Sequence, residues 1–101
     1  MYIFLRKDMS EAYKIIQSGH ALFEHARTLT PEQKPAETSS FCLLEADDES
    51  ELMQIASKLD RDNIHFTAFH EPDFDTGYTA IAAGPIYGAD RKKFKKYRFF
   101  K

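Results

Sequence analysis

The sequence contains a single cysteine, no tryptophan and no long apolar run. One cysteine cannot form an internal disulfide, and Cys42 lies in an apolar stretch, so we expect it to pack as a small hydrophobic side chain. No stretch approaches the roughly 20 apolar residues that cross a bilayer, and the run after Met1 meets a charge at Arg6, so we expect no signal peptide. With 101 residues, 43% of them hydrophobic, the chain is expected to form one soluble, cytoplasmic domain with no membrane partner.

Several common catalytic arrangements are missing as well. There is no glycine-rich phosphate loop, and no serine or cysteine occupies a strand-to-helix elbow. Four histidines invite a metal hypothesis, but His20 and His25 are five positions apart, about 140° round an expected helix. His65 and His70 fall on opposite sides of an expected strand. Because no pair can chelate a metal locally, the sequence predicts neither a metal nor a cofactor.

Charge is distributed unevenly along the chain. The formal net charge is −2, yet residues 89–101 contain seven basic residues and one acid, which leaves −8 on residues 1–88. Aromatic residues are interleaved with these cations. The segment is expected either to contact RNA through phosphates and stacking, or to dock on its own acidic body, and composition leaves both open. The candidate RNA-binding residues are Arg91, Lys92, Lys93, Lys95, Lys96 and Arg98.

The longest expected helix begins after Ser10. This serine is a suitable N-cap, and no proline follows until Pro31. Apolar residues recur at three- and four-residue spacing and predict the helix face that lies on a sheet. They are Ala12, Ile15, Ile16, Gly19, Phe23 and Ala26. A second stripe on the same helix is polar and consists of Tyr13, Gln17, His20 and Glu24.

Four short segments rich in apolar and β-branched residues predict strands. They are residues 2–6, 40–46, 64–70 and 79–83. The last of them, Thr79 to Ala83, lacks polar alternation and ends at Gly84-Pro85, so we expect it to be buried on both faces.

The remaining segments complete the expected fold. Asp47 or Asp48 is expected to cap a second helix, and residues 30–39, with two prolines, are expected to form a surface connection. The order of elements predicts an α/β fold, a three-layer sandwich with a mixed four-stranded sheet whose last two strands are antiparallel. We expect one domain over residues 1–88, followed by a basic aromatic tail over residues 89–101.

Three stretches of the chain carry a resemblance to a known family. They are Ile3 to Arg6 followed by Asp8, then Gln17-Ser18-Gly19-His20-Ala21, and Thr79 to Pro85. In order and spacing, residues 1–85 resemble the type II peptidyl-tRNA hydrolases. The resemblance implies that family's fold, and hydrolysis, without metal or cofactor, of the ester that joins a peptide to the terminal ribose of tRNA.

The resemblance also implies the residues of a site. Gln17 and Thr79 match the family's helix glutamine and the threonine at the start of its last strand. His20 matches the histidine of its Gln-x-x-His-Ala pattern, and Glu71 stands where the family has an aspartate after the third strand. The implied roles are that Glu71 or His20 takes the proton of the attacking water, while Thr79 and Gln17 orient that water.

One important position departs from the family. Its lysine falls at Tyr13, and Lys14 is one position further on, about 100° round the helix, so these two residues are left to assist the oxyanion. Two functions follow: a hydrolase of peptidyl- or aminoacyl-tRNA, or a non-catalytic relative that keeps the fold and binds RNA or a protein. The expected partner is tRNA or another RNA, and a homodimer is a further open alternative.

Overall fold

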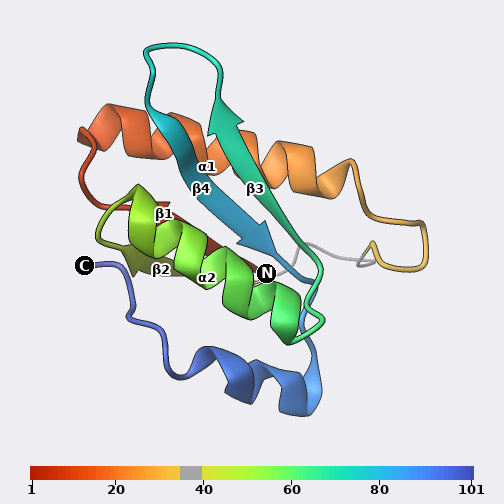
Figure 1. The fold of residues 1–101 in the computed structure, drawn as a ribbon. Helices are drawn as coiled ribbons and strands as arrows, with labels where there is room; N and C mark the ends of the chain where they lie inside the picture. Colours follow the sequence, from red (N-terminus) through yellow and green to blue (C-terminus); the bar gives the residue numbers. More distant parts are fainter. Residues whose placement is uncertain (35–39) are drawn as a thin grey trace.

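The computed structural model describes residues 1–34 and 40–101, so part of the connection expected at residues 30–39 lies outside the described residues. The strands are β1 (Tyr2–Arg6), β2 (Cys42–Ala46), β3 (Phe66–Glu71) and β4 (Gly77–Ala83), and the helices are α1 (Glu11–Ala26), α2 (Glu49–Arg61) and the 3₁₀ helix η1 (Gly88–Phe94). The four strands form one sheet in the order β2-β1-β4-β3. Figure 1 shows this sheet with α1 and α2 on its opposite sides.

The sheet is mixed, as the sequence predicts. β1 pairs in parallel with β2, whereas β4 is antiparallel to both β1 and β3. β4 therefore lies inside the sheet, and Thr79 to Ala83 are all buried. The expectation of a buried last strand that pairs antiparallel with the strand before it is confirmed.

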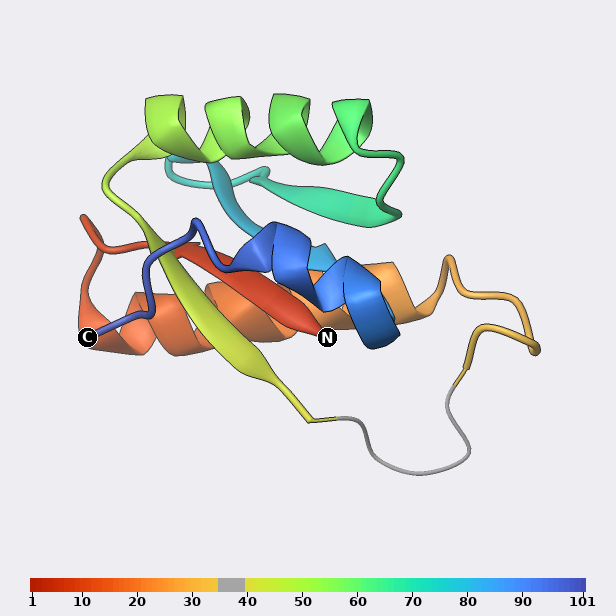
Figure 2. The same cartoon turned by 90° about the horizontal axis from the view of Figure 1, so that it is seen from below.

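The two faces of the sheet carry different cores. The face covered by α2 and η1 has large side chains, among them Phe4, Leu52 and Ile81. The face covered by α1 has a smaller cluster that includes Ala21, Ala80 and Ala82. Figure 2 shows the sheet between α2 and α1. Small residues on the α1 face let the helix approach the sheet closely, which brings polar side chains of the helix against polar groups of the strands.

Capping residues define where both long helices begin. The Ser10 side chain accepts a hydrogen bond from the backbone N–H of Tyr13 at 3.2 Å. Of the two aspartates expected to cap the second helix, Asp48 does so, accepting from the backbone N–H of Glu51 at 2.9 Å. These bonds satisfy amide groups that a helix start otherwise leaves without a partner.

The orientation predicted for α1 is wrong. The stripe expected to lie on the sheet faces solvent: Ile15 is 73% exposed, Ile16 54% and Phe23 66%. The buried residues of α1 are instead Gln17, Ala21 and His25. The physical reason is that the strands offer hydrogen-bond partners to the two buried polar side chains. The amide of Gln17 and the imidazole of His25 can therefore be buried without leaving a polar group unpaired.

His25 illustrates this pairing. Its Nε2 lies 2.6 Å from the carbonyl oxygen of Gly84, and its Nδ1 lies 2.9 Å from Oγ1 of Thr67. A neutral imidazole satisfies both contacts, since Nε2–H donates to the carbonyl and Nδ1 accepts from the hydroxyl.

The C-terminal segment docks on the body. Phe94 is 3% exposed and stacks on Tyr2 with ring centroids 3.9 Å apart. Beyond η1 the chain crosses the outer edge of β2, where Phe99 forms an antiparallel bridge with Leu44. Arg98 pairs with acids of the body, including Glu51 at 2.7 Å. Of the two alternatives left open for this segment, docking is what the structure shows, and RNA contact stays a prediction.

The strand expected over residues 40–46 is β2, which lies at an edge of the four-stranded sheet and has Leu43 37% exposed. Within residues 1–34 and 40–101, no helix is both long enough and apolar enough to span a membrane.

Candidate functional site

A chain of buried hydrogen bonds joins α1 to the adjoining ends of β3 and β4. The Oγ1–H of Thr79 donates to Oε1 of Gln17 at 2.6 Å, and Nε2 of Gln17 donates to Oε2 of Glu71 at 2.6 Å. Gln17 and Thr79 are fully buried, and Glu71 is 8% exposed. Three residues widely separated in sequence thus form one polar unit, and Glu71 is its least buried member.

A β-bulge places Thr79 in this unit. In the pairing of β3 with β4, Phe69 stands opposite Ala80 and His70 opposite Tyr78, so Thr79 is the extra residue. Ala80 packs on the α1 face of the sheet, and simple alternation would turn Thr79 to the other face. The bulge breaks that alternation, and Thr79 bonds to a residue of α1 instead.

Glu71 is held as a carboxylate. The hydrogen bond from Gln17 is the main reason that its pKa is lowered from the ordinary value, and the backbone N–H of Asp73, 3.1 Å from Oε1, adds to the effect. Positive charge on His20 and His70 acts in the same direction. Both carboxylate oxygens therefore accept hydrogen bonds, and the group is ionised at neutral pH.

Tyr13 and Thr76 form the next part of the site. The Tyr13 hydroxyl lies 3.2 Å from Oγ1 of Thr76, in the loop between β3 and β4. The two hydroxyls are neutral groups that can donate hydrogen bonds near the Gln17–Glu71 unit.

Arg6 fixes this loop, which sequence reasoning missed. Its Nη1 donates to the carbonyl oxygens of Thr76 at 2.8 Å and Tyr78 at 3.0 Å. Nε and Nη2 bind the two oxygens of Asp8, each at 2.9 Å. This bidentate pair is the main reason that the pKa of Asp8 is lowered and that of Arg6 raised. An arginine and an aspartate two positions apart at the end of a strand were the available signal, but nothing in the sequence showed which loop the arginine would hold.

The other two residues implied by the resemblance lie differently. His20 is exposed and stacks on Phe69, with ring centroids 4.8 Å apart, so it stands beside the site on the surface. The ammonium of Lys14 binds Glu11 at 3.2 Å and lies 5.1 Å from the centre of the Phe100 ring. The structure therefore joins Gln17, Glu71 and Thr79 by hydrogen bonds. Tyr13 bonds to the neighbouring loop instead, His20 lies at the surface beside the site, and Lys14 is engaged elsewhere.

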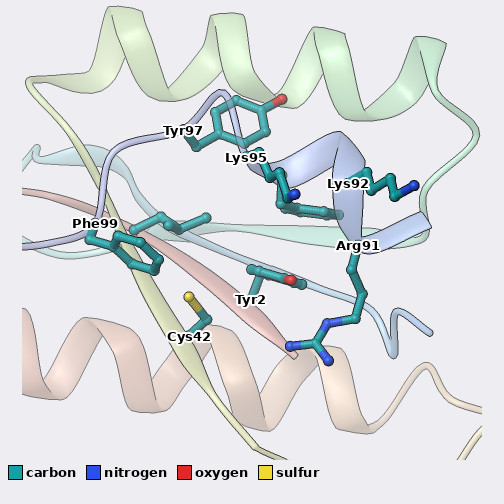
Figure 3. Close-up of a pocket in the computed structure, with 9 residues that line it drawn as sticks. Tyr2, Cys42, Arg91, Lys92, Lys95, Tyr97 and Phe99 are labelled. Atoms are coloured by element: carbon teal, nitrogen blue, oxygen red, sulfur yellow. The ribbon is translucent and has the colours of Figure 1, made fainter. Parts of the chain in front are cut away.

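A second feature is an apolar cavity of about 610 Å³ between β2 and the C-terminal segment. Figure 3 shows Tyr2, Tyr97 and Phe99 around it, with Cys42 at one side. Three of its lining residues, Arg91, Lys92 and Lys95, are cations.

The six candidate RNA-binding cations divide into two groups. Lys93 pairs with Asp90, Lys96 with Asp62, and Arg98 with acids of β2 and α2. In the part of the chain that the structure describes, Arg91, Lys92 and Lys95 form no ion pair with a carboxylate. The unpaired cations are thus the ones that line the cavity.

Over the described ranges 1–34 and 40–101, no group of three or more His, Cys, Asp or Glu side chains is placed to hold a metal ion.

In the comparisons with known proteins, the chain matches no family model and no curated protein. The site therefore offers an ionised carboxylate, oriented by a buried amide, with two hydroxyls and an imidazole nearby.

Proposed function

We propose that the protein is a divergent relative of the type II peptidyl-tRNA hydrolases, with their fold, that hydrolyses the ester of peptidyl- or aminoacyl-tRNA. The observation that carries the proposal is the hydrogen-bond chain from Thr79 through Gln17 to Glu71. These three positions were singled out by resemblance to one family, and they are also the ones that bond to each other.

In the proposed reaction Glu71 receives the proton of the attacking water. The water oxygen bonds to the ester carbon, the bond from that carbon to the ribose oxygen breaks, and the proton passes from Glu71 to the departing ribose oxygen. Gln17 and Thr79 are both buried and act through Glu71 as positioning residues. Gln17 donates to the carboxylate, and Thr79 fixes the orientation of the Gln17 amide.

Tyr13 is the proposed donor to the oxyanion. Its hydroxyl brings a hydrogen bond but no charge, and the loss of one good oxyanion donor costs ~10²–10³ in rate. The lowered pKa of Glu71 also makes it a weak base. The proposal therefore includes slow turnover.

The test is release of peptide from peptidyl-tRNA by the purified protein. Wild type should release peptide, and Glu71→Gln should reduce the rate by ~10²-fold or more, because it removes the proton acceptor. Glu32→Gln is the control, because Glu32 is an exposed carboxylate that follows α1 in the sequence, and it should not change the rate. Tyr13→Lys should raise the rate, since it adds a cation beside the developing negative charge. Absence of release by wild type and by Tyr13→Lys would contradict the proposal.

A second function, binding of RNA without catalysis, is favoured by the three unpaired cations at the aromatic cavity. Cations suit phosphates, and Phe99, the exposed ring of the cavity, suits a stacked base. The triple variant Arg91→Gln, Lys92→Gln, Lys95→Gln should weaken tRNA binding and reduce its salt dependence. The matched triple variant Lys93→Gln, Lys96→Gln, Lys101→Gln removes the same charge elsewhere in the segment and should weaken binding less. Binding without peptide release would select this second function, and equal losses in the two variants would contradict a role for the cavity.

A further inference from the structure

The outer face of α1 is the most unusual surface of the described chain. Ala12, Ile15, Ile16, Gly19, Phe23 and Ala26 are all exposed, and they form one stripe along the helix. Gln17, Ala21 and His25, which face the sheet, lie on the opposite side of the helix from this stripe. An amphipathic helix normally buries its apolar side. A helix that buries its polar side and exposes large apolar residues indicates that something else covers them.

Apart from Ile16, the stripe is arranged symmetrically about Gly19. Ile15 and Phe23 lie four positions to either side of it, and Ala12 and Ala26 lie seven. A twofold axis at Gly19 therefore sets Ile15 of one copy at the level of Phe23 of a second, antiparallel copy, and Ala12 at the level of Ala26. The stripe is thus complementary to itself in this one arrangement.

Charge at the ends of α1 favours the same arrangement. Glu11 lies eight positions before Gly19 and Arg27 eight positions after it. Antiparallel pairing puts the acidic start of one helix at the level of the basic end of the other, and it also aligns the helix dipoles favourably. Parallel pairing would place like charges together.

Gly19 lets the two helices approach. A Cβ at this position would have no heavy atom within 4 Å in the single chain, so the glycine is not explained by packing within the molecule. In the middle of a helix a glycine is destabilising by roughly 1 kcal/mol relative to alanine. At the centre of a helix pair it permits close contact between backbones, as glycine does elsewhere.

We infer that the α1 stripe is the interface of a homodimer in which two α1 helices pack antiparallel across a twofold axis at Gly19. The interface is independent of the proposed hydrolysis, because Gln17 and Glu71 lie on the sheet side of α1. The occupant is a second copy of this chain.

Sedimentation equilibrium over a concentration series tests the inference. Wild type should be dimeric, and Ile15→Glu should raise the dissociation constant at least about tenfold, since it places a charge in an apolar seam. Phe74→Glu is the control: Phe74 is 85% exposed on the loop between β3 and β4, and the dimer should be unchanged. Circular dichroism checks that both variants stay folded. A wild type that is monomeric at every concentration would overturn the inference and assign the stripe to a different protein.

Cysteine cross-linking tests the register. In a Cys42→Ser background, Gly19→Cys should form a disulfide-linked dimer on mild oxidation, because position 19 lies on the axis. Ala12→Cys alone should not, but a mixture of Ala12→Cys and Ala26→Cys proteins should cross-link. Self-linking of Ala12→Cys with no linking of the mixture would overturn the antiparallel arrangement.

Discussion

The side-chain amide of Gln17 lies 2.6 Å from the carboxylate of Glu71 and fixes a residue of β3 to the middle of α1. The opposite end of the same amide accepts from Thr79. Since Nε2 can only donate and Oε1 can only accept, the amide has one orientation that satisfies both neighbours. Stability and candidate chemistry therefore depend on the same side chain.

Replacement of Gln17 by leucine should destabilise the protein while keeping the volume similar. The buried Thr79 hydroxyl would lose its acceptor, at a cost of about 1–3 kcal/mol, and the pKa of Glu71 would rise because its main hydrogen bond is gone. Urea unfolding measures the first effect and NMR titration the second. Gln54→Leu, at an exposed position of α2, should change the free energy of unfolding by less than about 0.5 kcal/mol. Equal effects from the two substitutions would contradict the role of the amide.

Replacement of Gly77 by alanine should also destabilise the protein. Gly77 has φ 80°, and an added Cβ would collide with the Glu49 carboxylate, which accepts from the backbone N–H of Tyr78 at 2.6 Å. Strain and the displaced hydrogen bond should together cost about 2–3 kcal/mol. Gly88→Ala is the matched control: Gly88 has φ 59° but open space around a Cβ, so only the backbone strain of about 1–2 kcal/mol applies. Thermal unfolding of the two variants should rank them in this order, and the reverse order would refute the collision.

Stability should fall as the pH drops below about 6.5, because of His25. The pKa of His25 is lowered in the fold, mainly by burial. The hydrogen bond to Gly84 raises this pKa in part, whereas His65 and the N-terminal amino group lower it further. As the pH falls, the unfolded chain therefore binds a proton at His25 before the folded chain does. The contribution of His25 to the free energy of unfolding is complete above the pKa of His25 in the unfolded chain, and it is lost as the pH falls toward the pKa of His25 in the fold.

Urea unfolding between pH 8 and 5 measures this loss. His25→Gln should be less stable at pH 8 but should show a flatter pH dependence than wild type. An unchanged slope in His25→Gln would show that another group carries the effect.

Removal of the Arg98 charge should release the C-terminal segment. Arg98 binds Glu45 at 3.0 Å, Asp47 at 3.2 Å and Glu51 at 2.7 Å, and these acids raise its pKa. Arg98→Gln should speed tryptic cleavage within residues 91–96, and high salt should do the same to wild type because the pairs are at the surface. Lys101→Gln removes the same charge from an exposed position and should leave the cleavage rate unchanged. Equal cleavage of all three proteins would contradict docking through Arg98.

Much of the fold could be predicted from the sequence, because the signals were local. Caps such as Ser10 and Asp48, and the unbroken apolar character of Thr79 to Ala83, depend only on neighbouring residues. The orientation of α1 could not be predicted in this way. Periodicity reports which residues share a face, but it does not show that the facing strands supply Thr67 and Glu71 as partners for buried polar side chains.

The site was predictable in part for the same reason. The pattern around Gln17 and Thr79 pointed to residues that the structure brings together. The bulge that turns Thr79 toward α1, and the clamp formed by Arg6, depend on long-range pairing that no local spacing reveals. Likewise, the composition of the last residues did not show which of their cations would be neutralised by the body.

The single bridge between Phe99 and Leu44 has a consequence for solution behaviour. It occupies amide and carbonyl groups along the outside of β2, which would otherwise be free to recruit a strand from another molecule. Truncation of the protein before Phe99, or displacement of these residues by a bulky C-terminal fusion, should therefore promote aggregation during purification even where the remaining fold is intact.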